Sequence, residues 1–526
     1  MMRKTSVSVG MISVLALAAC GDSGEDAPGE SGGEAATGGE VNIAYNAQPP
    51  TMDPLNTTAH ASRVLARVMF EPLLDFDAEG EVQPVLAEEF EVSEDGLTLT
   101  FTLREDVPFH DGSTMEAADV VASLERWVEM SIVGSTYFSE ADVDSPEEGV
   151  VTLELPEPMY VAPQLLADPG QMPHVMPAEV IEDAGPDGIQ EHIGTGPYQW
   201  GTWETDQYMR MDRFADYSSP EGAPSGMAGE KTAYFDEMFF HFVGDESTRL
   251  MGIQTGEYDV ATPIPWDNVD QIEDEPSINM TRGESGFTFG LFNKDQGPMA
   301  DEDMRHAVIA AMDTEEILLS AYGSEDYFTQ NSAMMPEDSP WHVPAESDFD
   351  DFYQNQDLEL AQEYLEDADY DGEVIRMVVS PEYADFYDSA VTLQHQLEEA
   401  GMNAELVSVD WSTVLDTMED PTAFEIAFSG LGNWPVVPST MYFLNEGTQG
   451  TTDSEEIFEA NAALISAEDE AGTLAAMEDL QAAASDYLPI VRFGDRQSAV
   501  GVNEEFEGFE WVTGVGEIFH HIRPAE

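Results

Sequence analysis

The chain of 526 residues contains one thiol, and the residues around it indicate what chemistry it could undergo. Cys20 follows an apolar run at 7–16 and residues 17–19, and Arg3 and Lys4 precede that run. A positive start, an apolar core too short to span a bilayer and small residues at its end are the layout of an export signal. The sequence LAAC at 17–20 also looks like the bacterial lipobox, in which the cysteine sulfur is acylated and the preceding peptide is removed. We expect Cys20 to be lipidated, and the alternative is a plain secretory signal with an incidental cysteine.

Patterns of hydrolytic and metal chemistry are missing from the sequence. After residue 40 we find no G-x-S-x-G nucleophile elbow, no H-E-x-x-H zinc pair and no thiol. Only His520 and His521 are adjacent among the ten histidines, and adjacent residues on a strand point to opposite faces, which disfavours chelation of one metal. Pairs of carboxylates could serve as a catalytic acid and base, but among 107 acidic residues such pairs occur by chance and do not indicate an enzyme. We expect no catalytic residues, no metal site and no cofactor, and a secreted hydrolase is the remote alternative.

Acidic residues far outnumber basic ones, and this excess disfavours anionic binding partners. The 107 Asp and Glu residues stand against 17 Lys and Arg, for a formal net charge of −90, and lysine occurs only at 4, 231 and 294. Such a chain repels phosphate backbones and anionic lipid surfaces, so we expect no nucleic-acid binding. Its self-repulsion weakens the fold at low salt and is screened at 1 M salt, where the Debye length is about 3 Å. We interpret the charge as a halophilic acidic surface; the rival is a site for cationic ligands, but so much charge cannot line one site.

Hydrophobic periodicity predicts a mixed α/β protein behind a flexible tether. Residues 21–40 have almost no apolar side chains and are typical of a disordered acidic linker. We expect a strand at 41–45, a helix within 61–74 that stops at Pro72, a hairpin around Asp95-Gly96 and a helix at 113–130. The remaining chain of about 485 residues is long enough for two or three domains.

Blocks of sequence along most of the chain carry a family resemblance. The first of them are TMDP (51–54), FEPLL (70–74), QPVLAE (83–88), SEDGLT (93–98), LREDVPFHDG (103–112) and EAADV (116–120). The later ones are GTGPY (194–198), GEYDV (256–260), LFNK (291–294), DMRHA (303–307), AMD (311–313), LEEAG (397–401) and DW (410–411). In this order they resemble the family 5 extracellular solute-binding proteins, which are the oligopeptide-, dipeptide- and nickel-binding components of ABC importers, over about residues 41–515.

The resemblance implies an α/β, bilobed periplasmic-binding-protein fold (type II, cluster C) with an extra subdomain in the first lobe. Proteins of this fold close around a ligand by a hinge. The expected parts are 1–20 as lipoprotein signal peptide, 21–40 as tether, 41–80 with 190–285 and 486–526 as lobe I, 81–189 as the extra subdomain, and 286–485 as lobe II. The β-rich segments 289–293 and 486–494 are expected to cross between the lobes.

Candidate ligand-binding residues follow from the resemblance and from the observation that ligand sites are apolar clefts with a few polar groups. The candidates are Asn46, Gln48, Trp411, Asn433 and Trp434, with Tyr387 and Arg496 as weaker ones. The resemblance places Trp434 in a loop of the second lobe that touches the ligand, where an indole can cover the ligand backbone. The alternative for Trp434 is an ordinary core tryptophan.

The segment after Trp434 departs from the family pattern. Peptide-binding relatives place an acid there, which holds the α-ammonium group of the peptide, whereas this chain has Val436 and Val437 between two prolines. An ammonium group without its partner is costly to bury. We keep a peptide-like solute as the first expectation, and modified peptides, opines, oligosaccharides or a nickel chelate as alternatives.

The resemblance also implies partners and a location. We expect a monomer that gives its solute, unchanged, to the permease subunits of an ABC transporter. The ATPase would reside on other chains, because no G-x-x-x-x-G-K-[ST] loop occurs here. The expected location is the periplasmic or cell-surface side of a bacterial membrane, with the lipid on Cys20 as the anchor.

Overall fold

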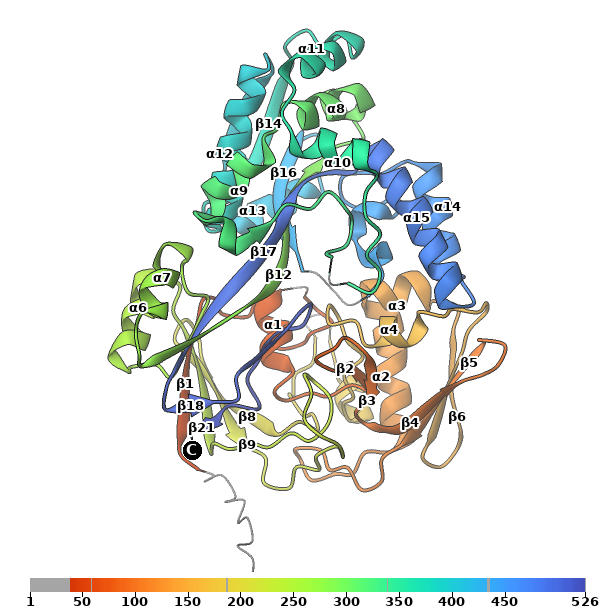
Figure 1. Ribbon diagram of the computed structural model, residues 1–526. Coiled ribbons are helices and arrows are strands. Elements are labelled where there is room, and N and C mark those ends of the chain that lie inside the picture. Colours follow the sequence, from red (N-terminus) through yellow and green to blue (C-terminus); the bar gives the residue numbers. More distant parts are fainter. Residues whose placement is uncertain (1–37, 58, 186–187, 338, 433–435, 526) are drawn as a thin grey trace, which may run out of the picture. The chain divides into compact units, whose positions relative to one another are not determined.

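The computed structural model describes residues 38–57, 59–185, 188–337, 339–432 and 436–525 (Figure 1). Residues 36–526 belong to one unit. The predictions for Cys20, Asn433 and Trp434, and for nearly all of the tether, therefore fall outside the described residues. Within the described part of the chain, no helix has the length and apolar character needed to cross a membrane.

The fold is built around one sheet of eleven strands. Its order is β15-β14-β16-β12-β17-β11-β1-β10-β9-β8, and β13 pairs with β17 beside this path. The strands are β1 (Glu40–Tyr45), β8 (Tyr198–Glu204), β9 (Tyr208–Arg213), β10 (Glu237–Phe242), β11 (Val260–Thr262), β12 (Ile278–Phe292), β13 (Phe328–Thr329), β14 (Val374–Val379), β15 (Asn403–Ser408), β16 (Ile426–Leu431) and β17 (Ile490–Asn503). Parallel pairs flank β1 and β14, and the other pairs are antiparallel.

The two long strands β12 and β17 join the two parts of this sheet (Figure 1). They pair with each other from Ile278↔Asn503 to Leu291↔Ile490. One end of the pair is flanked by β11 and the other end by β16. We call the part around β1 and β8–β11 lobe I, and the part around β14–β16 lobe II. The residue-level lobe boundaries expected from the sequence stay a prediction.

Helices cover the sheet of lobe II, where α12 packs on β14, β15 and β16. The helices of this lobe are α8 (Glu302–Ala310), α9 (Thr314–Tyr322), α10 (Ser347–Gln354), α11 (Leu358–Asp367), α12 (Ala384–Glu399), α13 (Trp411–Met418), α14 (Glu455–Ile465) and α15 (Glu470–Tyr487). The helices earlier in the chain are α1 (His60–Ala66), α2 (Ala117–Met130), α3 (Ile132–Tyr137), α4 (Ala162–Leu166), α5 (Ala178–Glu182), α6 (Glu246–Thr255) and α7 (Val269–Glu273).

A separate antiparallel sheet forms the extra subdomain. Its order is β4-β5-β7-β6, and its strands are β4 (Ala87–Val92), β5 (Thr98–Leu103), β6 (Asp142–Glu147) and β7 (Val150–Glu154). The chain turns between β4 and β5 at Gly96, whose φ of 70° favours glycine, so the expected hairpin is confirmed. Helix α2 packs on β6 and β7. The short pairs elsewhere are β2 (Leu74–Phe76) with β3 (Val82–Pro84), β18 (Phe506–Glu507) with β21 (Arg523–Pro524), and β19 (Glu510–Val512) with β20 (Gly516–Ile518).

The helix expected within 61–74 was predicted too long, because α1 ends at Ala66. Beyond it, the carbonyl of Val68 accepts the N–H of Tyr198 and the carbonyl of Met69 accepts the N–H of Gly196. Pro72 has no N–H to offer to the carbonyl of Val68, four residues earlier in the chain. Partners from the segment 194–198 therefore replace the missing turn of helix.

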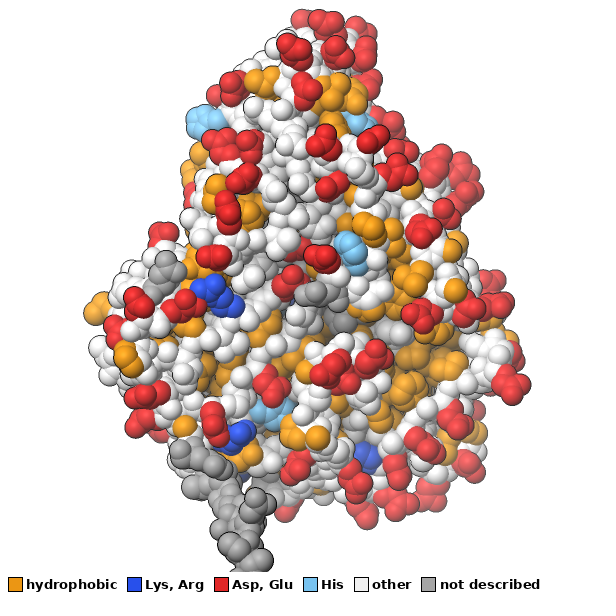
Figure 2. Space-filling model, in the orientation of Figure 1, with side chains coloured by type: hydrophobic (Ala, Val, Ile, Leu, Met, Phe, Trp, Pro, Cys, Tyr) orange, Lys and Arg blue, Asp and Glu red, His pale blue; other side chains and the backbone are white. Residues whose placement is uncertain are grey.

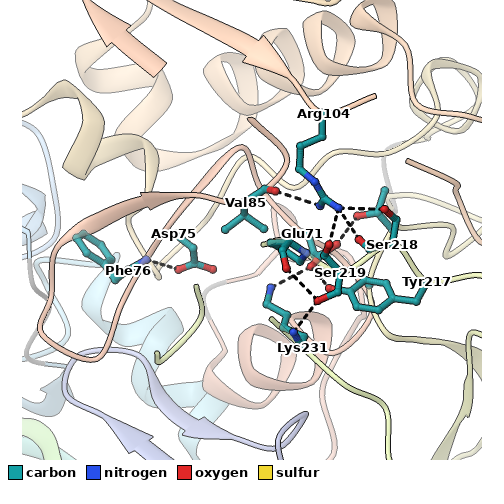
Figure 3. Close-up of polar contacts among 12 residues, drawn as sticks. Glu71, Asp75, Phe76, Val85, Arg104, Tyr217, Ser218, Ser219 and Lys231 are labelled. Atoms are coloured by element: carbon teal, nitrogen blue, oxygen red, sulfur yellow. Dashed lines mark hydrogen bonds and ion pairs between the residues drawn. The ribbon is translucent and has the colours of Figure 1, made fainter. Parts of the chain in front are cut away.

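A buried ion pair fixes the chain just after α1 (Figure 3). The Nζ of Lys231 lies 3.0 Å from Oε1 of Glu71, and both side chains are 1% exposed. The Tyr217 hydroxyl donates to Oε1 of Glu71 at 2.8 Å, and the Thr195 hydroxyl donates to Oε2 at 3.0 Å. Asp75 is buried beside this pair, and its desolvation raises the pKa of its carboxyl to about 6. Glu71 thus ties three distant segments of the chain to the end of α1.

We predict that Lys231→Met lowers the free energy of unfolding by about 3 kcal/mol, because it leaves the Glu71 carboxylate buried without its counter-charge. Urea unfolding at constant salt measures this change. The double variant Glu71→Gln, Lys231→Met should recover much of the loss. As a matched control, Arg213→Gln removes a surface ion pair with Asp236 and should cost less than about 1 kcal/mol. A Lys231→Met effect no larger than that of the control would contradict the prediction.

Candidate ligand-binding site

Three aromatic side chains of lobe II form a cluster near the crossing strands. Tyr383 is the N-cap of α12, Phe386 lies in the first turn of that helix, and Trp411 begins α13. The ring centroid of Tyr383 lies 4.9 Å from that of Trp411, edge-on, and 5.0 Å from that of Phe386, stacked. The backbone at Trp411 is held in place because its main-chain N–H donates to the carboxylate of Glu382 at 3.0 Å. Since Tyr383 is exposed and Trp411 half-buried, the cluster offers aromatic surface to a ligand.

An ion pair connects this cluster to β17. The Nη1 of Arg496 lies 2.8 Å from Oδ2 of Asp385, and its guanidinium lies over the ring of Phe386 at 5.5 Å from the centroid. Burial lowers the pKa of Arg496, but the Asp385 carboxylate and the neighbouring tyrosines outweigh it, and the pKa is raised overall. A Cβ at Gly430 would lie 2.9 Å from Phe386 and 3.2 Å from Arg496, so glycine permits this close packing at the end of β16.

Helix α1 of lobe I carries a row of basic side chains, which Arg67 continues at the C-cap. His60 Nε2 lies 2.9 Å from the Glu517 carboxylate of β20, and the guanidinium of Arg67 donates to the carbonyls of Val515 and Pro169. Arg63 lies between them on the same face of the helix, because residues three and four apart are neighbours on an α-helix.

Tyr45 ends β1, and its side chain is buried against Phe240 and Phe519. Burial and the charge of Glu517 raise the pKa of its phenol well above the usual range.

Residues 81–453 match the model of the bacterial extracellular solute-binding proteins, family 5 middle region. The probable peptide ABC transporter periplasmic-binding protein y4tO of Sinorhizobium fredii is 30% identical over 377 residues, which cover 68% of each chain.

The chain belongs to this family of solute-binding proteins.

The family is not one of enzymes; its members bind a solute outside the cytoplasm for an ABC transporter. The glutathione-binding protein GsiB of Escherichia coli is 27% identical over 383 residues, which cover 70% of each chain. The dipeptide-binding protein of Pseudoalteromonas sp. SM9913, solved with Met-Leu, superposes with a TM-score of 0.80 at 18% identity, over 93% of this chain and all of the other. The expected family and its periplasmic-binding-protein fold are thereby confirmed.

The candidate residues of this solute-binding protein lie in different surroundings. Trp411 and Arg496 come together through Phe386, which contacts both. Tyr387 lies one turn into α12 and packs half-buried against the core of lobe II. Asn46 is exposed directly after β1. The role of each of these residues in binding a solute stays a prediction.

Gln48 has a partner inside lobe I. Its Oε1 accepts the indole N–H of Trp203 at 3.3 Å and the N–H of Asp206 at 2.6 Å, so it fixes the turn between β8 and β9. The residues that the sequence did not single out are Tyr45, Arg63, Tyr383, Asp385, Phe386 and Glu517. The one sequence signal for Tyr45 is its place at the end of the first strand, and Asp385 and Phe386 directly precede the candidate Tyr387.

The two valines that stand where the resemblance led us to expect an acid are core residues. Val436 is 1% exposed and Val437 is fully buried, and both pack in a large apolar cluster with Phe443. Two acids elsewhere have partners of their own: Asp385 pairs with Arg496, and Glu517 accepts from His60 and Thr262.

His520 and His521 lie in a turn, so the strand assumed for them in the sequence was wrong. Their ring centroids are 4.2 Å apart, and both side chains are buried. Desolvation lowers the pKa of His521 to about 4 and also lowers that of His520, so both rings are neutral at pH 7. Among the described residues, no group of three or more His, Cys, Asp or Glu is arranged to hold a metal ion.

Proposed function

We propose that this protein captures a peptide-like solute between its lobes and delivers it to the permease of an ABC importer. The observation that carries the proposal is the aromatic cluster of Tyr383, Phe386 and Trp411, joined to the Arg496–Asp385 pair. Aromatic surface with a few placed polar groups at a domain interface is typical of small-molecule sites. The names of y4tO and GsiB, which concern a peptide and glutathione, support the same class of solute.

A solute without a free α-ammonium group suits this cleft best. The acid that holds this group in peptide-binding relatives is replaced here by Val436 and Val437, which are buried among apolar side chains. Modified peptides therefore fit better than simple peptides, because a buried ammonium group without a counter-charge is costly. An opine, an oligosaccharide or a nickel chelate is the second candidate, and the same two valines favour it over an ordinary peptide.

We predict that simple unblocked di- to pentapeptides bind poorly and that their N-acetylated forms bind better. Native mass spectrometry of the protein purified with its endogenous solute tests the prediction directly. Trp434→Ala should weaken binding of the retained solute by roughly 2 kcal/mol, which is the binding free energy typically lost when an aromatic anchor is truncated. A mixed population of ordinary free peptides in the cleft would contradict the proposal on the α-ammonium group. Sustained turnover of any bound compound would contradict the transport role.

A lipid on Cys20 is the proposed anchor, supported by the sequence LAAC at 17–20. We predict that mass spectrometry of the mature protein from a bacterial host finds an N-terminal, acylated Cys20. Cys20→Ala should release the protein from the membrane fraction, because the thiol that carries the acyl chain is lost. An unmodified N-terminus at another residue would overturn this proposal.

The acidic surface is proposed to be an adaptation to high salt. Acidic side chains are scattered over the face drawn in Figure 2, where few basic ones are visible. We predict that the melting temperature rises as NaCl is raised from about 0.05 M to 2 M, because screening removes the mutual repulsion of these carboxylates. Thermal unfolding by circular dichroism measures the response. A flat response over this range would contradict the adaptation.

A further inference from the structure

Two hydrogen bonds join the extra subdomain to lobe II. Tyr137, which ends α3, donates its hydroxyl to Oδ1 of Asn445 at 3.3 Å. The N–H of Tyr160, between β7 and α4, donates to the carbonyl of Ala467 at 3.0 Å. Asn445 lies between β16 and α14, and Ala467 lies in the turn between α14 and α15. Figure 1 shows α3 and α4 beside the ends of α14 and α15 and apart from the crossing strands β12 and β17.

The subdomain and lobe II also share one apolar cluster. Its buried members include Trp127 and Phe138 of the subdomain and Phe443 and Leu464 of lobe II, and the half-buried ring of Tyr137 packs against it. Burial raises the pKa of the Tyr137 phenol, so this group keeps its proton and can donate it. Moving the subdomain away from lobe II would therefore break both hydrogen bonds and expose apolar surface to water, which is unfavourable.

A second contact between the lobes lies next to the crossing strands. Trp266, which follows β11 of lobe I, stacks on Tyr327 with ring centroids 4.8 Å apart. Tyr327 directly precedes β13, which pairs with β17 at Arg496. The pairing of β12 with β17 is irregular between Glu284 and Gly286, and such an irregularity lets a strand bend. If the lobes turn about this part of the crossing, the Trp266–Tyr327 contact moves little, because it lies close to the axis.

We propose that the contacts of Tyr137 with Asn445 and of Tyr160 with Ala467 form a latch, which holds the lobes closed over a captured solute. A rotation about the crossing strands moves the groups farthest from them the most, so opening breaks the latch and keeps the contact beside β17. This inference rests on the proposed capture of a solute between the lobes and adds how that solute is retained. The rate of solute release then depends on residues of the extra subdomain.

A disulfide across the latch tests whether this contact forms in solution. The variant combines Tyr160→Cys and Ala467→Cys with Cys20→Ala, so that no other thiol is present. Two residues joined by a main-chain hydrogen bond of 3.0 Å have Cα atoms within about 7 Å of each other, which permits a disulfide. We expect mild oxidation of the dilute protein to link most molecules internally, as intact-protein mass spectrometry measures. The control pair Tyr160→Cys with Ala368→Cys, which ends α11, should stay reduced.

The same variant tests retention of the copurified solute, which native mass spectrometry follows during dialysis. The oxidised protein should release this solute at least about tenfold more slowly than the same protein after reduction, because the linked lobes cannot separate. Without engineered cysteines, Tyr137→Phe removes one hydrogen bond of the latch and should speed release roughly fivefold. The matched control Tyr370→Phe removes a hydroxyl that bonds Glu373 and Asn403 within lobe II, and should leave the rate unchanged. Melting curves establish that all variants are folded.

A latch pair that oxidises no better than the control pair would overturn the latch. Equal release from the oxidised and reduced protein, or a Tyr137→Phe rate equal to that of Tyr370→Phe, would also overturn it and leave solute capture intact. If no solute copurifies, that result bears on the proposed function, and small-angle X-ray scattering still tests the latch. The reduced protein should then have a larger radius of gyration than the oxidised one, and equal radii would overturn the latch.

Discussion

Burial of its few cationic side chains is the constraint on which this structure depends. Charged side chains are rarely buried in proteins unless they are paired. Here nearly half of the described lysines and arginines are buried, namely Arg67, Arg126, Lys231, Arg249, Lys294, Arg305 and Arg492. Acidic residues are left largely unopposed at the surface. The interior therefore relies on close hydrogen-bonded pairs that salt screens weakly, whereas the surface relies on salt to reduce its repulsion.

Several of these buried cations hold the backbone where the crossing strands meet lobe II. Lys294 donates to the carbonyls of Phe292 and Pro489, at the end of β12 and just before β17. Arg305 donates to the carbonyl of Tyr487, at the end of α15. These carbonyls would otherwise be buried without partners, which costs free energy comparable to a lost hydrogen bond. The lobe II end of the crossing is thus fixed by buried cationic side chains.

The sequence predicted the elements whose formation depends on residues close together in the chain. The hairpin at Asp95-Gly96 needs a positive φ that glycine supplies, and the sequence carries this requirement directly. The length of α1 could not be predicted from the sequence. The carbonyls of the expected last turn accept hydrogen bonds from residues more than a hundred positions later, so the helix ends early. The partner of His60 on α1 could not be predicted for the same reason, since Glu517 contacts it from the far end of the chain. Family resemblance supplied the fold but could not supply these contacts.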